Sequence, residues 1–96
     1  MDIRKEIEEK RERILAVAAE HGARNVRIFG SVSRGEADEK SDIDFLVELD
    51  QDRSLMDHAG LQIALQELFD RKIDVVSDRG LKPRIKDRVL REAVPL

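Results

Sequence analysis

The stretch that decides the fold is FGSVSRGEADEKSDIDFLVE, residues 29–48. It closes one apolar run, turns through Gly30 and Ser31, crosses an acidic loop and opens a second apolar run with Asp42 and Asp44. An apolar run that ends in Gly-Ser predicts a strand followed by a turn, and alternation from residue 42 predicts a second strand. Carboxylates pack poorly in a strand, so their presence there asks for an explanation.

Patterns outside this stretch predict an α-β-α-β-α-β-α chain. Apolar residues at helical spacing indicate helices, and alternating ones indicate strands. Ser54 and Asp57 form a capping-box pattern, and Pro83 suits the first turn of a helix. The predicted helices are 2–20, a short turn at 31–35, 54–69 and 83–94, and the predicted strands are 26–31, 42–49 and 72–77.

The alternation within each strand separates an apolar face from a polar one. Side chains two residues apart share a face. Val26, Ile28, Ile43, Phe45 and Ile73 fall on the face expected to pack against helices. The opposite face is expected to stay open, and it carries Ser31, Asp42, Asp44 and Asp74 together with the apolar residues Phe29, Leu46 and Val76.

Three carboxylates gathered on an open face favour a metal site. Asp42 and Asp44 stand about 6–7 Å apart along the strand, on the same side. Like charges held close destabilise each other; either protonation or a divalent cation can relieve the repulsion, and neutral pH favours the cation. Mg²⁺ takes one or two protein carboxylates and completes its shell with water and phosphate oxygens. Asp-x-Asp alone fits solvated strand residues equally well.

The Gly-Ser turn and its neighbours favour a phosphate site beside those carboxylates. Gly30 leaves room for a phosphate to approach the backbone, and Ser31 can donate its hydroxyl at a helix N-terminus. Arg34 can pair with a phosphate or with an aspartate. Gly35 allows a backbone conformation closed to most residues. Each has an ordinary structural explanation alone, but together before Asp-x-Asp they favour a nucleotide site.

Composition narrows the class of protein. Residues 1–96 fit one domain, and the absence of Cys excludes disulfides and thiol chemistry. No apolar run reaches membrane-spanning length, and the charged N-terminus does not resemble a signal peptide, so a cytoplasmic protein is expected. Charge is uneven: residues 36–52 carry net −7 and residues 79–96 net +4. A net charge of −3 with 3% aromatics argues against a nucleic-acid binder.

GSVSRGEADEKSDIDFLVE, followed by KIDVV, resembles the signature of the DNA polymerase β nucleotidyltransferase superfamily. Chain length and the segment LKPRIKDRVLREAVPL resemble its minimal nucleotidyltransferases. The resemblance implies a mixed-sheet α/β fold, ATP and two Mg²⁺ ions. It assigns Gly30, Ser31, Arg34 and Gly35 to the nucleotide, and Asp42, Asp44 and Asp74 to metal and catalysis, with Asp74 helping to activate an acceptor hydroxyl.

The resemblance also implies a partner. Many minimal members act as antitoxins of HEPN-domain toxins, and some transfer AMP to a tyrosine of the toxin. This chain has no Tyr, so such an acceptor would belong to the partner. The leading hypothesis is therefore a protein adenylyltransferase.

Two other hypotheses stay open on sequence alone. The chain could neutralise a toxin by occlusion through its basic C-terminal helix and the apolar residues Phe29, Leu46 and Val76, or it could transfer a nucleotide to a small molecule. The sequence leaves undetermined the preferred base, the acceptor, self-association and the role of the acidic loop at residues 36–39.

Overall fold

The elements follow the predicted order with two differences and two additions: residues 31–35 form a turn and no helix, the first predicted helix is divided in two, and a 3₁₀ turn and a fourth strand are added. The computed structural model describes residues 3–38 and 40–96. Its helices are α1 (Ile3–Glu9), α2 (Arg11–Glu20), α3 (Leu55–Gln66), the 3₁₀ turn η1 (Asp78–Gly80) and α4 (Pro83–Glu92). Its strands are β1 (Ala23–Phe29), β2 (Ile43–Leu49), β3 (Ile73–Ser77) and β4 (Val94–Pro95). Among the described residues, no helix is long and apolar enough to cross a bilayer.

The strands form one mixed sheet in the order β3-β2-β1-β4. β2 runs parallel to β3, with α3 as the crossover between them, and β1 is antiparallel to both β2 and β4. The mixed-sheet α/β nucleotidyltransferase fold predicted from the sequence is confirmed. In the parallel pair Asp44 is the register partner of Asp74, so two of the predicted site residues lie side by side.

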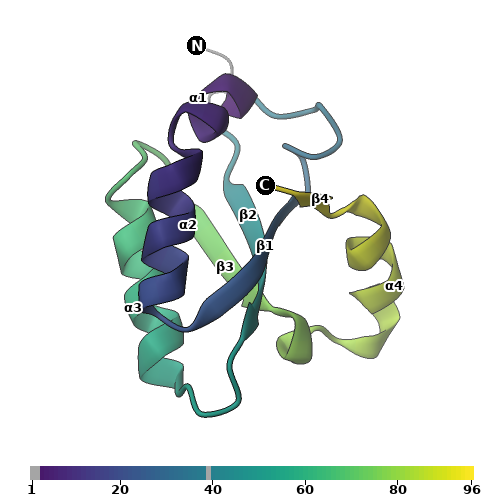
Figure 1. The fold of residues 1–96 in the computed structure, drawn as a ribbon. Coiled ribbons are helices and arrows are strands. Elements are labelled where there is room, and N and C mark those ends of the chain that lie inside the picture. The colour runs from purple at the N-terminus through teal and green to yellow at the C-terminus, as the bar shows by residue number, and fades with distance from the viewer. Residues whose placement is uncertain (1–2, 39) are drawn as a thin grey trace.

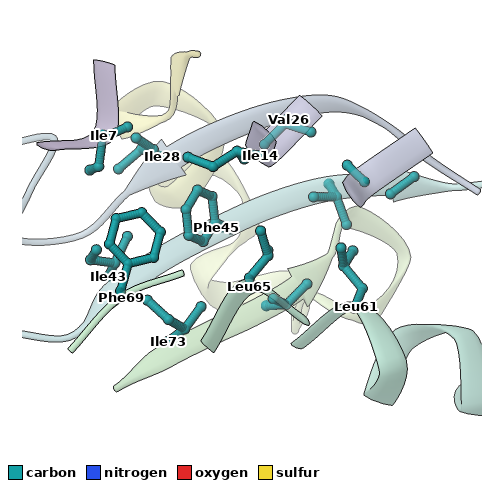
Figure 2. Close-up of a cluster of buried hydrophobic side chains, with 14 of the residues drawn as sticks. Ile7, Ile14, Val26, Ile28, Ile43, Phe45, Leu61, Leu65, Phe69 and Ile73 are labelled. Carbon is teal, nitrogen blue, oxygen red and sulfur yellow. The ribbon is translucent and has the colours of Figure 1, made fainter. Parts of the chain in front are cut away.

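The core lies between the sheet and the first three helices. Figure 2 shows Ile7 and Ile14 from the N-terminal helices meeting Ile28 and Phe45 from the sheet. Phe45 is completely buried on the central strand, with its ring centroid 6.4 Å from that of Phe69. The predicted core residues Val26, Ile28, Ile43, Phe45 and Ile73 are all buried, which confirms the sorting of strand faces.

The predicted helix 2–20 is wrong at one point, because the structure interrupts it at Lys10. (Residue 2 lies outside the described residues.) The Lys10 ammonium pairs with Glu6 at 3.0 Å and donates a hydrogen bond to the Leu68 carbonyl. It also lies 4.8 Å from the centre of the Phe69 ring. Both halves bury apolar residues, Ile3 and Ile7 in α1 and Ile14 and Ala18 in α2.

Two features of the sheet were not predicted. β1 begins at Ala23 rather than at residue 26, because a bulge between Arg24 and Arg27 carries the strand past Asn25, whose φ is +50°. The last helix ends at Glu92, since the residue before Pro95 is restricted to extended backbone. Val94 and Pro95 then pair with β1 as β4. The capping box at Ser54 is confirmed.

The face expected to be open is bordered by a helix. α2 and α3 lie on one side of the sheet and α4 on the other (Figure 1). Leu46 was expected as an exposed residue of this face, but it is fully buried. Its cross-strand partner is Arg27, whose aliphatic stem can cover it, and Val89 of α4 is also buried outside the main core cluster. Leu46 is therefore unavailable as part of a partner surface.

Candidate active site

Gly30 and Asp44 form the tightest part of the site. Gly30 has φ of +76°, a conformation that L-residues rarely adopt. A Cβ at this position would lie 2.3 Å from Asp44 Oδ2. The sequence suggested that Gly30 leaves room for a phosphate, whereas in the structure it leaves room for a carboxylate. The glycine thus fixes where the Asp44 carboxylate can stand.

The three aspartates interact electrostatically. Asp44 and Asp74 are neighbours across the parallel β2–β3 pair, and Asp42 precedes β2. Burial, then the charge of Asp74, then the charge of Asp42 raise the pKa of Asp44 to about 6. Arg34 and Lys72 oppose this shift more weakly. A carboxyl whose charged form is destabilised by its neighbours gains from a cation, which is what the chemistry of a divalent-metal site requires.

The aspartates do not yet converge on one point. In the described part of the chain, no group of three His, Cys, Asp or Glu side chains stands close enough to hold a metal ion. Asp42 is turned toward Lys72, with Oδ2 4.0 Å from Nζ. The donor set fits Mg²⁺ in its chemistry, because carboxylate oxygens are the protein ligands that this ion takes. The assignment of the three aspartates to metal and catalysis stays a prediction.

A hollow of about 440 Å³ lies against Asp42 and Asp44. The turn residues Gly30, Ser31 and Arg34 line it on the same side. Its volume lies within the range of small-molecule sites. The structure therefore gathers five of the seven predicted residues around one hollow, while Asp74 and Gly35 lie outside its lining.

α4 forms the far wall of the hollow, which sequence reasoning missed. Ile85, Arg88, Val89 and Glu92 of this helix line it. Their spacing of three and four residues puts them on one helical face. That periodicity was visible in the sequence, but it did not say which surface the face would meet.

Arg34 is held by carboxylates of its own chain. Its Nε donates to Glu36 at 2.9 Å, and its Nη1 donates to Glu92 of α4 at 3.1 Å. These contacts raise the pKa of Arg34, the bond to Glu36 most. The sequence suggested either a phosphate or an aspartate as the partner of Arg34. In the structure the partners are two glutamates, one of which lies on the wall of the hollow.

The acidic loop now has a structural role. Besides pairing Glu36 with Arg34, it folds around Asp38, which accepts from the Lys40 amide at 2.9 Å and from the Ser41 hydroxyl at 3.1 Å. Glu39 lies outside the described residues. Gly35 has φ of +73° with open space where a Cβ would be, so it serves the backbone path of the turn.

Comparison with known proteins shows the family to which the chain belongs. A model of the family described as "Nucleotidyltransferase domain" matches residues 3–96. The chain belongs to this family. It is an enzyme of the nucleotidyltransferase class, as the sequence predicted.

The relatives point to the minimal members of the family. A Methanocaldococcus jannaschii protein, provisionally named a protein adenylyltransferase, is 40% identical over 92% of this chain and 95% of its own length. Protein adenylyltransferase MntA of Thermococcus cleftensis is 41% identical over 76% of this chain and 74% of its own. Both relatives carry the name protein adenylyltransferase, and together with the first solved structure described next they confirm the resemblance to minimal nucleotidyltransferases.

Solved structures share the fold. One described provisionally as a minimal nucleotidyltransferase superposes with a TM-score of 0.87 at 51% identity, over 100% of this chain and 97% of its own. A crystal structure of a toxin-antitoxin with AMP-PNP superposes with a TM-score of 0.74 at 21% identity, over 88% of this chain and 69% of its own. The second likeness concerns the fold alone.

Proposed function

We propose that this nucleotidyltransferase moves AMP from Mg²⁺-ATP to a hydroxyl of a partner protein, a tyrosine of a HEPN-domain toxin, and so acts as an antitoxin. The observation that carries the proposal is that Asp42, Asp44 and the Gly30–Ser31 turn line one hollow. Two relatives that carry the name protein adenylyltransferase support a protein acceptor. The toxin partner rests on the family resemblance.

The reaction needs the residues around the hollow in distinct roles. The acceptor oxygen bonds to the α-phosphorus of ATP, the bond between that phosphorus and the bridging oxygen breaks, and pyrophosphate leaves. Mg²⁺, when bound, neutralises charge on the phosphates. Asp42 and Asp44 would hold it, and Asp74, next to Asp44, would take up the hydroxyl proton. The Gly30–Ser31 turn and Arg34 would hold the triphosphate.

The decisive experiment follows label from ATP. The chain is incubated with Mg²⁺, ATP labelled at the α-phosphate and a purified HEPN-domain protein encoded by a neighbouring gene. We expect label on the partner, and a Tyr→Phe change of its acceptor should remove the label. Asp44→Asn should abolish transfer, whereas Asp52→Asn, a change at an exposed acid outside the hollow, should not. Absence of transfer from every nucleoside triphosphate would contradict the proposal.

Binding can be checked without a partner. If the carboxylates and the turn hold Mg²⁺-ATP, the ligand stabilises the native state by mass action and raises the melting temperature. We expect no rise when Mg²⁺ is chelated, and none in Asp42→Asn/Asp44→Asn. A wild-type chain that shows no rise at millimolar Mg²⁺-ATP would have a degenerate site.

Occlusion is a second candidate, favoured by an exposed apolar pair. Leu55 and Met56 at the start of α3 are 84% and 82% exposed, and this adjacent apolar pair could be covered by a partner protein. Neutralisation of the toxin by wild type and by Asp42→Asn/Asp44→Asn separates the two candidates. Equal neutralisation would favour occlusion, and loss of neutralisation would favour transfer.

A further inference from the structure

Two guanidinium groups converge on one carboxylate at the edge of the hollow. Arg34 Nη1 lies 3.1 Å from Glu92 Oε2, and Arg88 Nε lies 3.4 Å from Glu92 Oε1. Arg34 comes from the turn after β1, and Arg88 comes from α4 on the opposite wall. The Glu92 carboxylate therefore marks a point that both arginines reach, one from each wall.

Arg88 retains donors for a further anion. Only its Nε is engaged, and among the described residues its two Nη groups have no hydrogen-bond partner. Its side chain is 68% exposed and lines the hollow together with Gly30, Ser31 and Asp44. A guanidinium presents its donors in a fork that matches two oxygens of a phosphate.

From this convergence we propose that Arg88 is a second arginine of the triphosphate site. Arg88 and Arg34 together bind the two phosphates that leave as pyrophosphate. The α-phosphate must stand near Asp42 and Asp44, where the bond is made and broken. The distal phosphates then extend along the Gly30–Ser31 turn toward Arg34 and Arg88. A triphosphate carries several negative charges against the single charge of Glu92, so it can take over the donors that Glu92 now holds.

This inference rests on the proposed function, and it adds that α4 supplies part of the nucleotide site. The motif residues from Gly30 to Asp74 end before residue 88, and the resemblance of residues 81–96 assigns no role to Arg88. The structure indicates it through the shared glutamate. In this arrangement Arg88 is a binding residue that also stabilises the developing charge on pyrophosphate.

The test compares two arginines of the same helix. Arg91 is exposed like Arg88, but its Nε donates to the Asp87 carbonyl and it does not line the hollow, so Arg91→Ala is the matched control. Binding of Mg²⁺-AMP-PNP and of AMP is measured by titration calorimetry for wild type, Arg88→Ala, Arg88→Lys and Arg91→Ala. Melting temperatures and circular dichroism confirm that each variant is folded.

Arg88→Ala should weaken Mg²⁺-AMP-PNP about tenfold, because a charge-assisted hydrogen bond is lost at a partly exposed position. Arg88→Lys should recover part of the loss, and Arg91→Ala should change affinity less than twofold. AMP lacks the distal phosphates, so its affinity should be equal in wild type and Arg88→Ala.

Two results would overturn the inference. One is an Arg88→Ala affinity for Mg²⁺-AMP-PNP no weaker than that of Arg91→Ala. The other is an equal loss for AMP, which would place Arg88 against the nucleoside or the α-phosphate. If the wild-type chain binds no nucleotide, the proposed function fails. If the wild-type chain binds Mg²⁺-AMP-PNP and only the Arg88 result is as described above, the inference alone fails.

Discussion

At the scale of single residues, Gly30 and Asp44 depend on each other. The positive φ of Gly30 turns the chain out of β1, and the missing Cβ leaves space for the Asp44 carboxylate. The carboxylate in turn stands beside Asp74 and close enough to the core to be half-buried. The site therefore stores electrostatic repulsion in the ligand-free chain, and this repulsion has measurable consequences.

Asp44→Asn should stabilise the metal-free protein at neutral pH. Well below pH 4, Asp44 is protonated in both the folded and the unfolded state, and it contributes nothing to the pH dependence of stability. As the pH rises from about 4 to the native pKa of about 6, only the unfolded state loses its proton, so stability falls. Above pH 6 the cost is complete, about 1–2 kcal/mol after allowance for solvent at the site.

Melting temperatures in chelator at pH 4 and pH 8 check this prediction. We expect Asp44→Asn to gain several degrees over wild type at pH 8 and much less at pH 4, where only the first part of the cost is present. The exposed acid Asp52 provides the control, since Asp52→Asn makes the same charge change away from the other two aspartates. A gain of equal size in the control, or at both pH values, would contradict the prediction.

Gly30→Ala and Gly35→Ala form a matched pair. Both glycines have φ near +75°, so each substitution should cost about 1 kcal/mol of backbone strain. Only at position 30 would the new Cβ meet Asp44, which must then rotate away. We expect similar losses of stability in chemical denaturation, with a further loss of Mg²⁺ affinity in Gly30→Ala. If Gly30→Ala leaves the Mg²⁺ affinity unchanged, Asp44 is not a ligand of the metal.

At the scale of elements, α4 is the most weakly anchored helix. Of the ten residues of α4, all of which the structure describes, only Val89 is buried. The ion pairs of Glu92 with Arg34 and Arg88 add little in water-exposed surroundings. The short strand β4 ties its end to β1. We therefore expect α4 to open locally more readily than the sheet unfolds.

Val89→Ala should loosen α4 alone. The variant loses two buried methyl groups and should cost about 1–2 kcal/mol, expressed locally because the helix has no other buried residue. Amide hydrogen exchange should quicken in Lys86–Glu92 and stay unchanged in β2. Leu90→Ala, at a position 39% exposed on the same helix, is the control and should have a smaller effect. Faster exchange throughout the sheet would show that α4 belongs to the global folding unit.

At the scale of the whole molecule, stability comes from a single core on one side of a four-stranded sheet. Phe45 occupies its centre, completely buried on β2, the strand that also carries Asp44. The acidic and basic halves of the sequence meet on the other side, where α4 faces the carboxylates across the hollow. The candidate site is therefore built on the sheet, and α4, which is less firmly anchored, completes it.

Phe45→Ala should therefore threaten the fold itself. Removing this ring should cost about 3–5 kcal/mol, a large share of the 5–15 kcal/mol typical of a small domain. Urea denaturation measures the loss, and Phe45→Leu, which keeps most of the apolar volume, should cost less than half as much. Equal costs for the two variants would mean that the site had collapsed around the smaller side chain.

Local sequence patterns predicted which side chains of each strand face the core, and they supplied the candidate residues of the site. Alternation separated Ile43 and Phe45 from Asp42 and Asp44, because side-chain direction in a strand is set by local geometry. The Gly30–Ser31 turn and Asp-x-Asp could be recognised as a nucleotidyltransferase signature because these residues lie close together in the sequence.

Tertiary structure alone decided what lies opposite those residues. The position of α4 over the polar face, the burial of Leu46, the pairing of β4 with β1 and the meeting of Arg34 and Arg88 at Glu92 all join segments far apart in the chain. The periodicity of residues 85–92 predicted an amphipathic helix but not the surface it would meet. Such contacts depend on the packing of complete elements, which no local pattern records.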